Sequence, residues 1–165
     1  MNLLIGLSKM SDNIDELVSR VEKLQKVQAS VGVTREDGIH EPSGMTYVDL
    51  HWLHHAGSSK NNLPARPISS IALMSFNGEP LIKKSLDKYF SNLNKRNGGG
   101  SAGDVFKPYL KGLLDYTQNY VFGSVSKLAP NSPYTVKMKG KNSPLQDTNQ
   151  LASQWKVRIN GKVIK

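Results

Sequence analysis

The segment Asn62-Leu63-Pro64-Ala65-Arg66-Pro67 constrains the fold of this chain more strongly than any other part of the sequence. Each proline fixes its own φ angle and pushes the residue before it toward an extended conformation. The segment is therefore neither a helix nor a flexible linker but a stiff connection, which we call the proline strut (residues 62–67). Its candidate interface residues are Leu63, Pro64, Arg66 and Pro67.

The strut carries one charged side chain, Arg66. Because the backbone on both sides of it is restricted, its guanidinium points in a limited set of directions, as an arginine that docks onto a neighbouring subunit would. The alternative is a rigid loop in which Arg66 pairs with a local carboxylate.

Length and composition exclude several protein classes. With 165 residues, the chain is long enough to bury a core as one domain without disulfides or a structural metal. The absence of cysteine excludes thiolate zinc sites, thiol catalysis and a disulfide scaffold, and it fits a reducing compartment. Residues 1–7 are apolar but short, and Lys9 and Asp12 follow closely, so we expect neither a signal peptide nor a membrane span.

The formal net charge of +9 is unevenly distributed. Residues 1–80 carry 7 Lys and Arg against 9 Asp and Glu, a net charge of −2, whereas residues 81–165 carry 15 against 4, a net charge of +11. A surface of this charge attracts either nucleic acid or an acidic protein, because long-range attraction does not depend on the chemistry of the partner. No RNA-binding signature or arginine-rich arm supports specific base reading.

Helical periodicity recurs in four stretches, which cover residues 11–28, 46–56, 79–96 and 104–126. Gly57 closes the second of these helices, and Pro80 occupies a favoured first position in the third. Pro108 is expected to confine the regular part of the fourth helix to its C-terminal side. Residues 68–76 are apolar and fit either a strand or a helical turn.

Alternation of apolar and polar residues predicts two strands. In residues 29–34 the side chains of Ala29, Val31 and Val33 are expected to point inward. In the second strand, which ends at Asn160-Gly161, we expect one buried face and one charged outer face. The buried face would contain Trp155, Val157 and Ile159, and the outer face Gln154, Lys156 and Arg158.

The remaining stretches are expected to be loops. These are a polar surface loop at residues 35–46, a flexible glycine-rich connector at residues 97–103 and a solvated basic loop at residues 137–141. Together these features predict an α+β fold, with a small antiparallel sheet packed against two or three longer helices and with extended loops. We expect residues 1–165 to form a single domain.

Three histidines, His51, His54 and His55, share the second predicted helix at spacings of three and four residues. That spacing suits metal ligands, and His40-Glu41 could add donors. However, no glutamate lies between the histidines as in a zinc hydrolase helix, and Trp52-Leu53 interleave with them. We therefore expect ordinary surface or interface histidines, no metal, no cofactor and no catalytic constellation.

Four segments together resemble a known protein family, the tail-completion or virion-morphogenesis (neck, head–tail connector) proteins of tailed bacteriophages. They are His54-His55-Ala56-Gly57, Leu63-Pro64-Ala65-Arg66-Pro67, Lys139-Gly140, and Pro144-Leu145-Gln146-Asp147-Thr148-Asn149-Gln150-Leu151. The chain departs from the family pattern at two positions. Asn149 replaces a glycine, although asparagine tolerates a positive φ, and Ile68 replaces the usual phenylalanine after the strut.

The resemblance implies a non-enzymatic structural virion protein, a neck, tail-completion or tail-terminator adaptor. It would form a homo-oligomeric ring between the head connector and the tail, bound to other neck, connector and tail proteins. It would be assembled in the host cytoplasm, with possible nonspecific contact with genomic DNA and no membrane association. Asp147, Thr148 and Asn149 would brace the turn before the last strand, although an ordinary turn is the alternative.

Two other functions stay open at this stage. The first is a basic nucleic-acid-binding module that uses the lysine-rich half, with an affinity for duplex DNA that falls steeply as salt rises. The second is a metal-dependent enzyme built on the histidine cluster, for which the sequence offers no acid, base or nucleophile arrangement.

Overall fold

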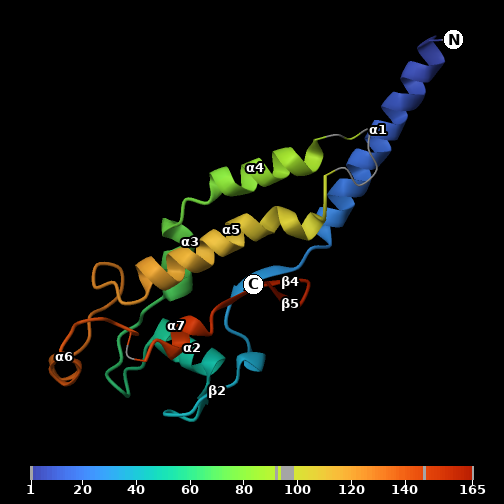
Figure 1. Ribbon diagram of the computed structural model, residues 1–165. Coiled ribbons are helices and arrows are strands. Elements are labelled where there is room, and N and C mark those ends of the chain that lie inside the picture. The colour runs from blue at the N-terminus through green and yellow to red at the C-terminus, as the bar shows by residue number, and fades with distance from the viewer. Residues whose placement is uncertain (1, 92, 94–98, 147, 165) are drawn as a thin grey trace. The chain divides into compact units, whose positions relative to one another are not determined.

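The computed structural model of the protein describes residues 2–91, 93, 99–146 and 148–164, and of residues 2–12 it describes the backbone alone. These residues form an α+β fold (Figure 1), so the fold class expected from the sequence is confirmed. The helices are α1 (Asn2–Gln25), α2 (Tyr47–Ala56), α3 (Ile68–Ser75), α4 (Glu79–Phe90), α5 (Ala102–Tyr116), α6 (Pro133–Lys139) and α7 (Gln150–Ser153), with a 3-10 helix η1 (Arg35–Asp37) and a π-helical segment η2 (Thr117–Val121).

The strands form two small antiparallel sheets. One has the order β1-β4-β5 and contains β1 (Ala29–Gly32), β4 (Lys156–Ile159) and β5 (Lys162–Ile164). In the other, β2 (Ile39–His40) pairs with β3 (Met45–Thr46). Asn160 and Gly161 join β4 to β5, with φ angles of 50° and 76°. Asparagine and glycine suit this two-residue turn because both tolerate positive φ.

The chain divides into two compact units, each built from segments that are far apart in the sequence. Unit 1 contains the described parts of residues 1–30, 77–110 and 158–164. Unit 2 contains residues 31–76 and the described parts of residues 111–157. The single-domain organisation expected from the sequence stays a prediction.

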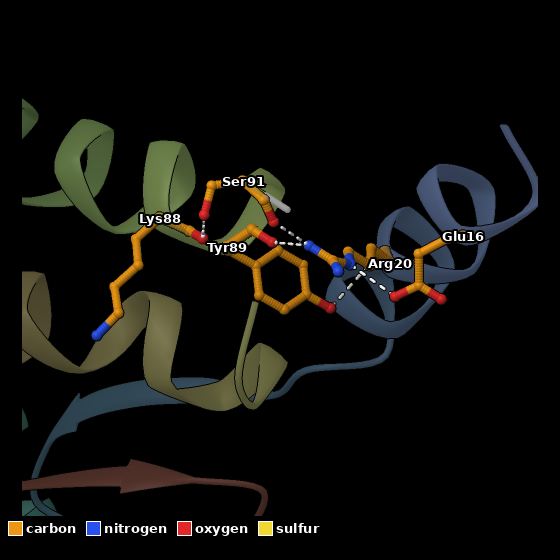
Figure 2. A network of polar contacts seen from close by, with 5 residues as sticks. All are labelled: Glu16, Arg20, Lys88, Tyr89 and Ser91. Carbon is orange, nitrogen blue, oxygen red and sulfur yellow. Dashed lines mark hydrogen bonds and ion pairs between the residues drawn. The ribbon is translucent and has the colours of Figure 1, made fainter. Parts of the chain in front are cut away.

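In unit 1, the buried guanidinium of Arg20 ties α1 to the C-terminal end of α4 (Figure 2). Its Nε donates to Glu16 Oε1 at 2.7 Å, and its Nη1 donates to the carbonyl oxygens of Tyr89 and of Ser91, the latter at 2.9 Å. The phenol of Tyr89 donates in return to the carbonyl oxygen of Arg20 at 3.3 Å. Burial raises the pKa of this phenol. One side chain therefore bonds to the backbone of a helix end that is 69 and 71 residues away in sequence.

Helix boundaries in unit 1 differ from those predicted. The first helix begins at Asn2, not Ser11, and α4 ends at Phe90. Pro108 lies inside α5 instead of limiting it, because a proline removes one backbone donor and the rest of the helix retains its bonds. Of the expected glycine-rich connector, residues 97–98 lie outside the described residues, and its last two residues, Ala102 and Gly103, already belong to α5.

Unit 2 has its core around Trp155 and the π-helical segment η2. The Trp155 ring makes edge contacts with His51 of α2, at 5.3 Å between centroids, and with Phe122, at 5.8 Å. Helix α3 packs against η2, and Ile68 and Val121 are fully buried. Residues 68–76, which the sequence left undecided, therefore form a helix whose apolar side chains belong to the core.

Several predictions for the sheets and loops need correction. Residues 35–46 contain η1, β2 and β3 instead of an irregular loop, and residues 137–139 belong to α6, capped by Ser132.

The faces of the two predicted strands are only partly as expected. Ala29 is exposed, whereas Val31 and Val33 are partly buried. The inward face of Trp155, Val157 and Ile159 is confirmed. However, Arg158 on the expected outer face is also buried, since alternation alone does not show what covers the second face of a strand.

Candidate functional site

The proline strut is held against the C-terminal end of α2. The backbone N–H of Arg66 donates to the carbonyl oxygen of His54 at 2.7 Å. Just before the strut prolines, Ser58 and Leu63 exchange two backbone hydrogen bonds, of 2.8 and 2.9 Å. The helix end and the strut, which the sequence analysis treated as separate motifs, therefore form one local structure.

Gly57 makes this close approach possible. It ends α2 with a φ angle of 73°, in the region that side-chain-bearing residues rarely adopt. A Cβ atom at this position would lie 2.7 Å from the backbone nitrogen of Ala65 and 2.7 Å from the carbonyl oxygen of Leu63. Only glycine lets the strut backbone pack directly on the helix end.

Arg66 points into the protein and is only 4% exposed. Its Nε donates to the carbonyl oxygen of Ala129 at 2.8 Å. Its Nη2 donates to the carbonyl oxygen of Pro130 at 2.9 Å and to Asn131 Oδ1 at 3.3 Å. Burial lowers the pKa of this guanidinium below its usual value. We call these contacts the Arg66 clamp, and they tie the strut to residues 129–131.

The clamp corrects both sequence-based interpretations of Arg66. Its guanidinium is not available to a neighbouring subunit, and its hydrogen-bond acceptors are two backbone carbonyls and an amide, not a carboxylate. Sequence could not reveal these acceptors, because every residue has a carbonyl oxygen and only the tertiary fold selects which ones face the arginine. Of the other candidate interface residues, Pro64 is exposed, while Leu63 and Pro67 are partly buried. Ala65, which the prediction left out, is exposed as well.

A pocket of about 530 Å³ lies beside the strut, entirely within unit 2. The four segments that carried the family resemblance each contribute to its wall. They contribute His54, the strut residues Leu63, Pro64 and Arg66, then Lys139, and finally Leu145, Thr148, Asn149, Gln150 and Leu151. The fold thus brings to one place segments that the sequence separates widely.

Of the predicted turn brace, residues 147–149, the structure describes Thr148 and Asn149, and the bracing role stays a prediction. Asp147 lies outside the described residues, and Thr148 is exposed. Asn149 adopts the left-handed conformation, with φ 57°, immediately before α7, but its side chain makes no capping hydrogen bond there. Asn149 therefore allows the turn through its backbone, as a glycine would, and does not brace it with its amide.

The three histidines of α2 lie in different surroundings. His51 packs on Trp155, and its Nε2 lies 3.1 Å from Ser69 Oγ. His54 faces the pocket, and the ring of His55 makes an edge contact with that of Trp52 at 5.3 Å. In the part of the chain that the structure describes, no three His, Cys, Asp or Glu side chains come together in a way that could hold a metal.

Two of these rings are neutral at neutral pH. Burial, helped by the charge of His55, lowers the pKa of His51 from 6.5 to about 4. Burial and the nearby Arg66 charge lower the pKa of His54 from 6.5 to about 4. The described wall of the pocket includes the cationic side chains of Arg66 and Lys139 and no Asp or Glu.

The pocket combines apolar walls with donors and cations. Leu50, Leu63, Pro64 and Leu151 supply apolar surface, while Asn62, Asn131 and Lys139 supply hydrogen-bond donors. Such a lining suits a protein segment that inserts an apolar side chain next to an acidic or carbonyl group.

No protein-family model, curated protein or solved structure matches this chain. Within the described residues, none of the helices is both long enough and apolar enough to cross a lipid bilayer. The strut, the pocket and the four resembling segments are therefore the features that bear on function.

Proposed function

We propose that this chain is a structural adaptor of a tailed-phage virion, a neck or tail-completion protein that forms a ring between the head connector and the tail. The observation that carries the proposal is the convergence of the four resembling segments on one pocket. Segments that serve a common contact surface are expected to meet in space, whereas chance matches of short motifs would be scattered over the fold.

The strut supports the proposal as a rigid contact element. Pro64 and Ala65 are exposed, and the Arg66 clamp fixes the backbone beneath them. A surface that is ordered before it binds loses little conformational entropy on binding. Arg66 therefore acts as an internal positioning residue, and the exposed edge of the strut makes the contact with a neighbour.

Charge supports an assembly role without specifying the partner. The net charge of +11 on residues 81–165 would attract acidic surfaces of neighbouring virion proteins. The same charge is also consistent with the alternative function, a basic nucleic-acid-binding module. That alternative predicts tight binding to duplex DNA at low salt. For an adaptor, we expect weak and sequence-independent DNA binding that disappears near physiological salt.

A null allele in a phage that encodes the chain tests the proposal. Electron microscopy of the lysate is expected to show filled heads and tails that are not joined, or tails with defective ends. Supplying the wild-type chain from a plasmid is expected to restore complete virions, and mass spectrometry should then find the chain in purified particles. Normal virions from the null allele, or virions that lack the chain, would contradict the proposal.

A further inference from the structure

Helix α1 presents an exposed apolar stripe. Ile14, Leu17, Val18 and Val21 have exposed fractions of 52%, 39%, 50% and 39%. Arg20, on an adjacent side of the same helix, binds both Glu16 and the end of α4 within unit 1. The helix is therefore anchored by one side, while several apolar side chains on another side contact solvent.

This stripe belongs to a heptad repeat that runs along the whole helix. Apolar residues recur at alternating steps of four and three, at Leu3, Leu7, Met10, Ile14, Leu17, Val21 and Leu24. In heptad notation, position a holds residues 7, 14 and 21, and position d holds residues 3, 10, 17 and 24. Such a repeat is the pattern of a helix that pairs with another helix in a left-handed coiled coil.

We propose that α1 pairs with α1 of a second copy of this chain as a parallel, two-stranded coiled coil. Parallel dimers favour β-branched residues at a and leucine at d. The helix has Ile14 and Val21 at a, and leucine at three of its four d positions. The pattern therefore matches itself, and it specifies a second copy better than it specifies an unrelated partner.

The positions that flank the seam allow this pairing. Positions e and g within α1 hold Leu4, Ser11, Val18 and Gln25, and Gly6, Asn13 and Arg20. Arg20 is the one charged residue among them, and Glu16 and the end of α4 already bind it. Like charges across the seam therefore do not oppose two parallel copies. The inference uses α1 alone and does not depend on the proposed function.

The length of α1 sets the strength of the contact. Its 24 residues span about 36 Å and provide about three heptads. A seam this short is near the lower limit for independent pairing, so we expect a monomer–dimer equilibrium that responds to concentration.

Sedimentation velocity of the full chain over a hundredfold range of concentration tests the pairing. The wild type is expected to move from monomer toward a larger species, and Ile14→Gln/Val21→Gln should raise the dissociation constant at least tenfold. Both side chains are exposed and glutamine is a good helix former, so the variant should fold. The matched control is Asp15→Gln/Glu22→Gln, two exposed b positions on the same helix, which should leave the equilibrium unchanged. A chain that stays monomeric throughout, or equal behaviour of the two variants, would overturn the proposal.

The direction of pairing can be tested because the chain has no cysteine. Val21→Cys places one thiol at an a position near one end of the repeat. In a parallel dimer the two thiols face each other, and oxidised glutathione is expected to convert most of the chain to a disulfide-linked dimer. In an antiparallel dimer they lie far apart. Glu22→Cys, at position b, serves as the control. Equal crosslinking of the two variants, or none in Val21→Cys, would contradict the parallel alignment.

Discussion

Two of the buried arginines, Arg20 in unit 1 and Arg66 in unit 2, hold the chain by different means. Arg20 is 1% exposed and Arg66 is 4% exposed, and both donate to backbone carbonyls far away in sequence. Arg20 also pairs with Glu16, whereas Arg66 donates to two carbonyl oxygens and a side-chain amide oxygen. In both units the planar guanidinium holds distant backbone segments together through several hydrogen bonds. Arg20 has the Glu16 carboxylate as an additional charged partner.

Each arginine also lies near a glycine that the packing requires. In unit 1 a Cβ atom on Gly99 would overlap the carbonyl oxygen of Tyr89 and lie 2.8 Å from Arg20 Nη1. In unit 2 a Cβ atom on Gly57 would strike the strut that Arg66 holds. The contacts of both arginines therefore depend on close backbone packing at a glycine, which any larger residue at that position would prevent.

The largest effect is expected for Arg20→Met. This change removes the guanidinium that donates to Glu16 and to the two carbonyl oxygens at the end of α4. Loss of one partner of a buried ion pair should lower the free energy of unfolding by about 4 kcal/mol, measured by urea denaturation. The exposed pair Lys83–Asp87 has the same i, i+4 spacing, so Lys83→Met is the control and should cost less than about 0.5 kcal/mol. Equal losses would show that Arg20 contributes no more than a surface ion pair.

The next largest effect is expected for Gly57→Ala. The new methyl group would meet two strut backbone atoms at 2.7 Å in a left-handed conformation, which should cost about 3 kcal/mol. Gly140→Ala is the control, because Gly140 has φ 70° but open space around it. It should cost about 1 kcal/mol from backbone strain alone. If the two variants are equally stable, the strut does not pack on the helix end as described.

A smaller loss is expected for Arg66→Lys. Lysine keeps the charge but cannot reproduce the fork that reaches Ala129 and Pro130, so unfolding should become easier by about 2 kcal/mol. Arg35→Lys, at an exposed arginine of unit 2, provides the control and should change stability by less than about 0.5 kcal/mol. An Arg66→Lys variant as stable as the wild type would return Arg66 to the docking role that the sequence suggested.

The smallest effect at neutral pH concerns His51 and His54. Because their pKa values in the fold, about 4, lie below the unfolded value of 6.5, the unfolded chain binds more protons between these limits. Stability should therefore fall as pH drops from about 6.5 to about 4, with no contribution at pH 7 and above. His51→Gln/His54→Gln should flatten the dependence of urea midpoints on pH in this range. An unchanged slope would mean that neither ring is neutralised by burial.

The sequence best predicted helix and strand ends, where a particular residue type is favoured for its effect on the local backbone. Thr46 and Gly57 bound α2 as expected, Pro80 lies in the first turn of α4, and β4 ends just before Asn160-Gly161 as expected. These signals are local. A capping side chain or a residue that tolerates positive φ fixes the backbone conformation of its immediate neighbours, whatever the rest of the fold does.

The candidate site was less predictable because its contacts are distant in sequence. The strut and its rigidity could be predicted, but the inward direction of Arg66 depends on carbonyl oxygens 63 and 64 residues away. No sequence feature predicted the burial of Arg20, because the carbonyl oxygens that it binds at the end of α4 are 69 and 71 residues away. The heptad repeat in α1, by contrast, was present in the sequence, and its significance became clear only when Ile14 and Val21 proved to be exposed.

At the centre of the proposed adaptor function we propose a rigid strut, held from inside by Arg66, that contacts a neighbouring virion protein through its exposed edge. Complementation of the null phage by Ala65→Glu tests it most directly, because this change keeps both prolines and Arg66 and adds a bulky charge to the exposed edge. We expect plating efficiency to fall at least a hundredfold while the melting temperature of the purified variant stays unchanged. Ser59→Glu, at an exposed position just before the strut, should complement fully. Full complementation by Ala65→Glu would contradict the claim.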